Sequence, residues 1–217
     1  MFKDRFIGMH PVKLQVNPIV KAYMISEALL WSAWNFVTPI FAVFIISNIT
    51  GGNVQIASIG FSIYLISRVI FELISGEYLG NTGDRKKLLT TVLGMLFISV
   101  SYAGFAFADT VTELFLFYTV SGMGIGIAAP AKNSLFSIHL DKKKEATEWG
   151  VTDAVVFICM ALASTVGGFI AAGYGFHILF LLACVVNFLG IIPYLLAVRE
   201  IKKKSKPRLS RKEIHFL

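Results

Sequence analysis

Charged residues are scarce in this sequence. Only 15% of its 217 residues are Asp, Glu, Lys or Arg, whereas 56% are hydrophobic. A chain this poor in charge cannot cover a water-exposed surface, so an ordinary soluble domain is excluded. The net charge of +7 does not indicate a nucleic-acid partner, because the basic residues lie between apolar runs and not together on one soluble face. The composition predicts a protein of the lipid bilayer.

Cysteine and histidine are also rare, which limits the chemistry open to the chain. Cys159 and Cys184 each lie near the middle of an apolar segment, where cysteine usually acts as a small buried hydrophobic residue. We therefore expect no disulfide, no metal site and no cofactor. An intramembrane enzyme would need a serine paired with a deep histidine, or a group of aspartates at one depth, and the sequence offers neither.

Long apolar runs dominate the chain instead. A helix needs roughly twenty apolar residues to cross a bilayer core. Helices are required because unpaired backbone groups are too costly in hydrocarbon, and the runs lack the alternation of a transmembrane barrel. The sequence therefore predicts an all-α, polytopic membrane protein with six transmembrane helices. These are expected at about residues 22–47, 54–78, 88–108, 112–138, 147–173 and 175–198.

Basic residues are absent from every second connection, and this absence predicts the orientation. Residues 48–53, 109–113 and 173–177 contain no Lys or Arg, whereas the connections near 85–87 and 142–144 and both ends of the chain are basic. By the positive-inside rule, basic connections stay in the cytoplasm. We expect a multi-pass protein of the plasma (cytoplasmic) membrane with both termini in the cytoplasm.

The same pattern divides the chain into three segments. Residues 1–21 are expected to form a cytoplasmic leader, residues 22–198 the six-helix transmembrane bundle and residues 199–217 a basic cytoplasmic tail. A tail rich in Lys and Arg beside a membrane helix suits anionic lipid headgroups. The lipid bilayer is thus the first predicted partner, and no nucleic acid is expected.

A short polar loop separates the second and third apolar segments. Glycines in such a loop permit a tight reversal with positive φ, an aspartate before a helix can cap it, and basic residues hold the loop in the cytoplasm. The residues that carry these features are Gly76, Gly80, Gly83, Asp84, Arg85 and Lys86.

This loop resembles the signature loop of the major facilitator superfamily of transporters, which also lies between helices two and three. The family pattern is Gly, three residues, Asp, a basic residue, one residue, Gly and two basic residues. A register that starts at Gly76 matches Gly83 and Arg85 but puts Gly80 at the Asp position. A register that starts at Gly80 matches Asp84 and Arg85 but lacks the second Gly. We prefer the first register.

Small residues recur in the fourth and fifth apolar segments, and the run in the fourth resembles the family's fourth helix. The run in the fifth resembles a motif associated with antiporters, but it lacks the Gly-Pro of that motif, so antiport is not inferred. Glycines let helix backbones approach closely, which favours association in lipid. We interpret these glycines as helix-packing positions: Gly122, Gly124, Gly126, Gly167 and Gly168.

Five ionisable residues lie inside the predicted spans, namely Glu27, Arg68, Glu72, Lys132 and Asp153. Each costs at least about 2.5 kcal/mol on insertion scales and so needs an explanation. Arg68 and Glu72 are four residues apart and share one helix face. Lys132 and Asp153 lie at similar depth on consecutive helices, so we expect a second pair there. Either these pairs are structural, or some of the residues line a path for solute or protons.

The resemblance covers nearly the whole chain and implies the amino-terminal half of a transporter. Helices one and four contribute to the central site of the family, which adds Trp34 and Asn35 to the candidate path. Such a protein would move a small solute by alternating access, with a coupling ion such as a proton. It would need a second six-helix half, either a second copy of the chain or a missing carboxy-terminal half. A non-transporting subunit of a larger membrane complex stays open as an alternative, and an intramembrane enzyme is less favoured.

Overall fold

The structure is a computed structural model that describes residues 17–205. Most of the predicted leader and most of the tail lie outside these residues. The described part is all-helical, and five of its stretches are long and apolar enough to cross a membrane. In chain order the elements are α2 (Pro18–Val37), η1 (Thr38–Ile40), α3 (Phe41–Asn48), α4 (Val54–Leu79), α5 (Asp84–Ala106), α6 (Val111–His139), α7 (Glu145–Leu189) and α8 (Ile191–Ser205).

The first candidate span consists of three consecutive elements, α2, η1 and α3, which together cover Pro18–Asn48. It begins inside the predicted leader, because the side chain of Asn17 accepts a hydrogen bond from the amide of Ile19 at 3.0 Å and caps the helix. Pro39 lies in the 3₁₀ turn η1. Proline has no amide hydrogen to donate, so the α-helical pattern is interrupted there.

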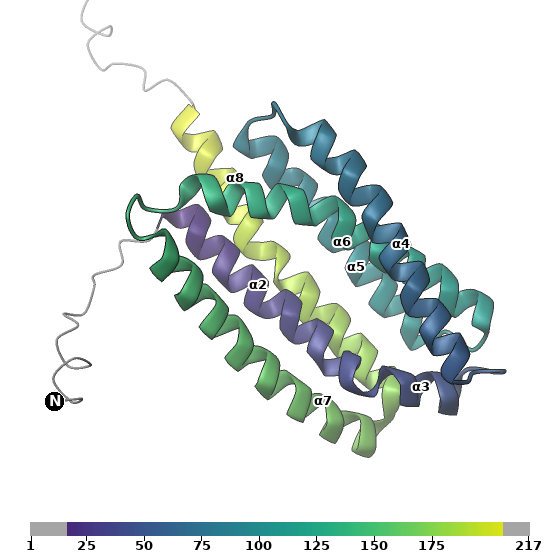
Figure 1. Cartoon of the computed structure of the whole chain (residues 1–217). Helices are drawn as coiled ribbons and strands as arrows, with labels where there is room; N and C mark the ends of the chain where they lie inside the picture. The colour runs from purple at the N-terminus through teal and green to yellow at the C-terminus, as the bar shows by residue number, and fades with distance from the viewer. Residues whose placement is uncertain (1–16, 206–217) are drawn as a thin grey trace, which may run out of the picture.

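The last two predicted helices belong to one apolar stretch of 55 residues, Glu145–Arg199. Within it, Gly175 has φ 83° and ψ 170°, a left-handed conformation that favours glycine. Figure 1 shows that α7 reverses direction here, and the second part of the helix returns alongside the first. The reversal coincides with the predicted boundary between residues 173 and 175.

The helices are arranged in two groups. In Figure 1, α2 lies beside α7 on the left, α4 lies against α6 on the right, and α5 and α8 run behind them. The helix α5 contacts α6, α7 and α8, so it joins the two groups from behind. The bundle therefore has one face formed by α2, α4, α6 and α7.

The contact between α4 and α6 is made by small residues. Ser67 and Ser75 of α4 donate hydrogen bonds to backbone carbonyls of α6 at 2.8 and 2.9 Å. Gly122 and Gly126 of α6 face the backbone of α4, so closely that a Cβ on Gly126 would lie 2.5 Å from the carbonyl oxygen of Arg68. Close backbone approach of this kind supplies the dispersion contacts that hold helices together in lipid.

The other predicted packing glycines differ among themselves. Gly124 of α6 faces Gly94 of α5, and a Cβ on Gly124 would lie 2.7 Å from the carbonyl oxygen of Gly94. Gly167 of α7 faces the backbone of Phe36 in α2. Gly168, in contrast, has no atom within 4 Å of the position of a Cβ, so no contact in the described residues requires glycine there.

The signature loop has a different conformation from the predicted one. Gly76 lies inside α4, and Gly80 and Gly83 have φ values of −50° and −76°, so the prediction of positive φ is wrong. The reason is that α4 extends to Leu79 and the chain then reverses with ordinary backbone angles.

The predicted capping role of Asp84 is also wrong. The N-cap of α5 is Gly83, without a side-chain bond, and Asp84 is the first helical residue. The carboxylate of Asp84 instead lies 3.2 Å from Nε2 of His139 at the end of α6. Arg85 and Lys86 are exposed. The loop is therefore joined to α6 through Asp84 while its basic residues stay accessible.

We expect Gly126→Ala to destabilise the bundle, because the new Cβ would meet the backbone of α4. Overpacking costs about 1–3 kcal/mol, of which about 1 kcal/mol is offset by the higher helix propensity of alanine. Gly168→Ala is the matched control, since that position is open. Thermal unfolding in detergent should show a lower melting temperature for the first variant only. Equal melting temperatures would contradict the packing role.

Candidate functional site

A buried ion pair joins the first span to α6. Nζ of Lys132 lies 2.6 Å from both carboxylate oxygens of Glu27. The side chains are only 5% and 6% exposed. The two residues come from helices far apart in the sequence, so the pair links α2 to α6 across the bundle.

Aromatic residues of α2 surround this pair. The indole Nε1 of Trp31 donates a hydrogen bond to Glu27 Oε2 at 3.0 Å. The Lys132 ammonium lies 5.9 Å from the ring of Trp31 and 6.0 Å from the ring of Tyr23, distances at which a cation is attracted to an aromatic face. Tyr23, Glu27 and Trp31 follow one another at intervals of four residues and so form one stripe along α2.

The stability of the pair depends on two opposing energies, the cost of desolvation and the attraction between the charges. Removing two charges from water is expensive, and their mutual attraction repays that cost only when the geometry is good. Here each carboxylate oxygen of Glu27 receives a bond from Lys132, and the indole of Trp31 adds another. The pair therefore has no net charge, but either residue alone would leave an uncompensated charge inside the bundle.

The predicted pair between Lys132 and Asp153 is wrong. Asp153 is exposed on α7, and Lys132 bonds to Glu27 instead. The physical reason is that α7 packs mainly against α2 and α5, so the depth shared by Lys132 and Asp153 does not bring them together.

The other predicted pair is present. Arg68 Nε lies 3.1 Å from Glu72 Oε2 on α4, and the side chains are 34% and 39% exposed. Asn35 does not join either pair, because its amide donates to the carbonyl oxygen of Trp31 in its own helix at 2.9 Å. Trp34 lies further along α2, in a pocket.

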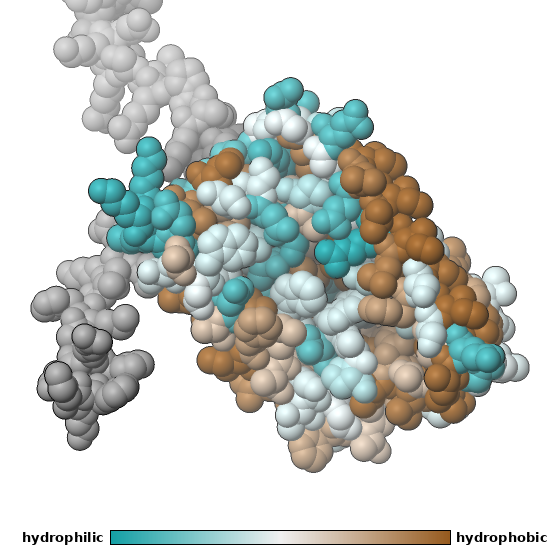
Figure 2. Space-filling view, in the orientation of Figure 1, coloured by the Kyte–Doolittle hydropathy of each residue, from teal (hydrophilic) through white to brown (hydrophobic). Residues whose placement is uncertain are grey.

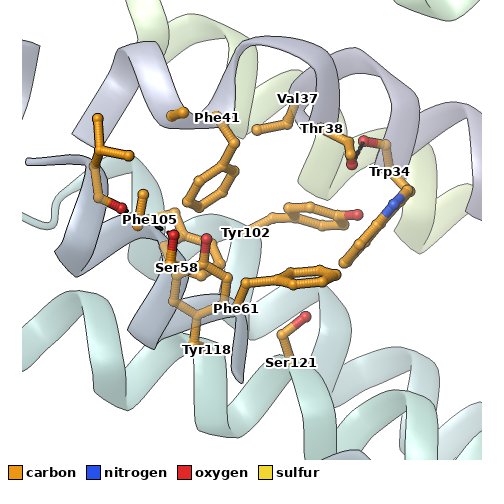
Figure 3. A pocket seen from close by; sticks show the side chains of 13 residues that line it. Trp34, Val37, Thr38, Phe41, Ser58, Phe61, Tyr102, Phe105, Tyr118 and Ser121 are labelled. Carbon is orange, nitrogen blue, oxygen red and sulfur yellow. Dashed lines mark hydrogen bonds between the residues drawn. The ribbon is translucent and has the colours of Figure 1, made fainter. Parts of the chain in front are cut away.

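This pocket, of about 300 Å³, lies between the first span, α4, α5 and α6. Figure 3 shows side chains from these elements pointing into it. Five of the lining residues carry a hydroxyl group, namely Thr38, Ser58, Ser121, Tyr102 and Tyr118. Six aromatic residues contribute to the lining, namely Trp34, Phe41, Phe61, Tyr102, Phe105 and Tyr118.

The surface of the bundle distinguishes the face near the ion pairs from the flank formed by α4. In Figure 2, hydrophilic surface is gathered over the middle and upper part of the face in view, and the flank on the right is hydrophobic. Exposed residues of α4 include Ile66, Val69, Ile70, Leu73 and Ile74. A flank of this kind suits contact with lipid.

Sequence reasoning missed two parts of the candidate site. The first part is the contact of Tyr23 and Trp31 with the ion pair, which could have been predicted because both residues lie four positions from Glu27 on the same helix face. The pocket residues Tyr102 and Phe61 come from α5 and α4, and no local pattern in the sequence connects them to Trp34. Within residues 17–205, no group of three or more His, Cys, Asp or Glu side chains is placed to hold a metal ion.

Comparison with known sequences identifies a family and several relatives of this chain. The chain matches the family model of the Major Facilitator Superfamily over residues 23–216. It is 26% identical over 151 residues to the multidrug resistance protein MdtG of Rahnella sp., a match that covers 67% of this chain and 36% of the relative. It is 25% identical over 183 residues to the multi-drug resistance efflux pump PmrA of Streptococcus pneumoniae, covering 83% of this chain and 44% of the relative.

Comparison with solved structures supports the fold. The bundle is similar to the POT family transporter PepTSo, with a TM-score of 0.71 at 16% sequence identity, and the match covers 83% of this chain and 37% of that one. At this identity the likeness concerns the fold alone. The chain spans about two fifths of the length of the curated relatives it matches.

We expect Lys132→Met to cost about 3–5 kcal/mol of stability, because it leaves the carboxylate of Glu27 buried without its partner. The double variant Lys132→Met, Glu27→Gln should be more stable than this single variant. The matched comparison is Arg68→Met with and without Glu72→Gln, where partial exposure should make the difference smaller. Melting temperatures in detergent measure both cycles. Strictly additive losses at Lys132 and Glu27 would show that the contact has no energetic coupling.

Proposed function

Because the chain belongs to the major facilitator superfamily, we propose that it carries a small solute across the membrane by alternating access. The observation that supports this function best is the buried contact between Lys132 and Glu27. Ionisable residues inside a membrane bundle are costly and mark the paths of ions and solutes. A purely structural contact between two helices of this bundle needs no charge, as the serines and glycines between α4 and α6 illustrate.

The ion pair offers a mechanism for coupling to protons. When Glu27 takes up a proton, its negative charge is lost and the ammonium of Lys132 no longer has an anionic partner. The energetic penalty of that unpaired charge favours a conformation in which Lys132 reaches water or an anionic group. Proton uptake would thereby be linked to movement of α2 relative to α6. Arg68, Glu72 and Asp153 are proposed to contribute to the same path from the more exposed face.

The solute class follows from the relatives. Two of them are named for multidrug resistance or efflux, and we propose drug-like organic compounds as the solutes of this chain. The half-buried Trp34, the half-buried Arg68 and Glu72 on α4 and the exposed Asp153 on α7 offer both apolar and polar contacts to such compounds.

The topology of the proposed transporter has six crossings. The reversal at Gly175 divides the stretch Glu145–Arg199, so that each part can cross separately. Because its basic connections favour the cytoplasmic side, we propose a plasma-membrane protein with both termini in the cytoplasm.

A second bundle is proposed to complete the solute path. The curated relatives are more than twice as long as the segment matched here. Asp153 of α7 is exposed, and Gly76 of α4 and Gly168 of α7 have open space at the position of a Cβ. These features suit close contact with another helical bundle, supplied by a second copy of the chain or by a separate carboxy-terminal half.

The topology predicts that Asn48→Cys and Lys142→Cys react from opposite sides of the membrane. Both residues are exposed; Asn48 lies at the first connection, which has no basic residue, and Lys142 lies in the fourth, which is basic. The variants are made in a background with Cys159 and Cys184 replaced by alanine. An impermeant maleimide added to intact cells should label position 48 only. Labelling of both positions from outside would contradict the orientation.

Transport itself is tested with purified chain in proteoliposomes that contain a pH-sensitive dye. With ethidium as the first probe of a panel of drug-like compounds, we expect solute movement to dissipate an imposed pH gradient. Glu27→Gln should abolish this coupling, because the amide takes up no proton, whereas Glu145→Gln at an exposed helix end is the matched control. Equal coupling in both variants would contradict the role of Glu27.

The mass of the particle in nanodiscs tests the second bundle in the same preparation. Transport by a dimer supports a second copy of the chain, and a monomer that gains transport only with a co-expressed partner bundle supports a separate half. A monomer that transports alone would contradict the need for a second bundle.

A further inference from the structure

The aromatic pocket is a separate feature from the ion pair. Trp34, at its wall, follows Glu27 by seven residues on α2, which corresponds to a rise of about 10 Å. The residues named as its lining come from the first span, α4, α5 and α6 of this chain. The volume of about 300 Å³ lies at the lower end of the range for ligand pockets.

The lining of the pocket selects by charge and shape. None of the lining residues is charged, so an ion would lose its hydration without gaining a partner. Aromatic side chains are the main contacts, and rings interact with one another in offset or edge-to-face arrangements. In Figure 3, the rings of Trp34, Phe61 and Tyr102 border the same space. The chemistry therefore favours a neutral aromatic molecule.

Tyr102 supplies a specific polar group in this apolar space. Its side chain reaches the pocket from α5, the residue is only 3% exposed, and its hydroxyl has no hydrogen-bond partner among the described residues. Figure 3 shows the hydroxyl directed into the space beside Trp34. Buried hydroxyl groups are usually paired, because an unmade hydrogen bond inside a protein is costly. A ligand with an acceptor oxygen at this point would satisfy the hydroxyl.

We propose that the pocket binds a neutral molecule of about two aromatic rings that carries a carbonyl or ether oxygen, with the Tyr102 hydroxyl donating to that oxygen. The rings fill the space between the first span and α4, and the hydrogen bond from Tyr102 fixes the orientation of the ligand. This site is distinct from the proposed proton-coupled path through Glu27. Its occupancy is measured by binding alone, so a failure of transport would leave the test unaffected.

Benzophenone is a suitable probe because it has two rings, one carbonyl oxygen and no charge. Under near-ultraviolet light, its excited carbonyl takes a hydrogen atom from a nearby C–H group, and the two radicals then join through a carbon–carbon bond. The full chain in nanodiscs is irradiated at increasing benzophenone concentration. We expect saturable labelling, mapped by peptide mass spectrometry to residues 34–42 and 54–61. Labelling that does not saturate, or that spreads over the lipid-facing part of α4, would overturn the proposal.

The hydrogen bond is tested with Tyr102→Phe, which keeps the ring and removes only the hydroxyl. We expect benzophenone to bind about three- to tenfold more weakly, as for the loss of one hydrogen bond. Diphenylmethane has the same rings without the oxygen. It should therefore inhibit benzophenone labelling equally well in the unchanged chain and in Tyr102→Phe, when the two proteins are compared at the same benzophenone occupancy. The matched control is Tyr194→Phe, another buried tyrosine with an unpartnered hydroxyl that does not line the pocket. Unchanged benzophenone affinity in Tyr102→Phe would overturn the assigned donor, as expected if a lipid acyl chain is the natural occupant.

A second variant tests the space itself. Ala42 is exposed at the edge of the pocket, so Ala42→Phe should fill part of it without disturbing the core. Ala161→Phe, at an exposed position of α7 outside the lining, is its control. Saturable labelling should be lost in the first variant and kept in the second. Retention of full labelling in Ala42→Phe would place the bound benzophenone elsewhere and overturn the proposal.

Discussion

The close approach of helix backbones is the constraint on which this bundle depends. Lipid tails are as apolar as leucine side chains, so the hydrophobic effect does not drive helices together inside a membrane. Contact has to come from dispersion and from interhelical hydrogen bonds, and both require short distances between backbones. The glycines and serines between α4 and α6 provide such distances, and Gly124 with Gly94 does the same between α6 and α5. The helix α6 is therefore fixed on two sides.

The ion pair is a consequence of this packing. With α6 held against α4 and α5, Lys132 points across the bundle and meets Glu27 of α2. The desolvation of both residues is then imposed by their neighbours, and the pair survives because each charge compensates the other. The loss of either charge would therefore expose the full desolvation cost of the remaining one.

Sequence alone predicted the features that the bilayer itself imposes. Apolar runs must be long enough to cross the membrane, and the breaks between them fall near the observed turns, including the one at Gly175. It failed where the answer depends on packing. The similar depth of Lys132 and Asp153 along their helices suggested that these two residues pair. The lateral position of α7, which packs mainly against α2 and α5, keeps Asp153 away, and Lys132 pairs with Glu27 instead. The backbone angles at Gly80 and Gly83 likewise depended on where α4 ends.

The two candidate regions share one stripe of α2. Tyr23, Glu27, Trp31 and Trp34 follow at intervals of four, four and three residues and so lie on the same face of the helix. The charged residue of the stripe, Glu27, lies where Lys132 can reach it. Trp34 lies further along the stripe, where Phe61 and Tyr102 form the other wall of the pocket. Since about 10 Å of helix separates Glu27 from Trp34, a ligand in the pocket has no need to touch the ion pair. Any coupling between the two regions would have to pass through the position of α2 as a rigid element, which both of them contact.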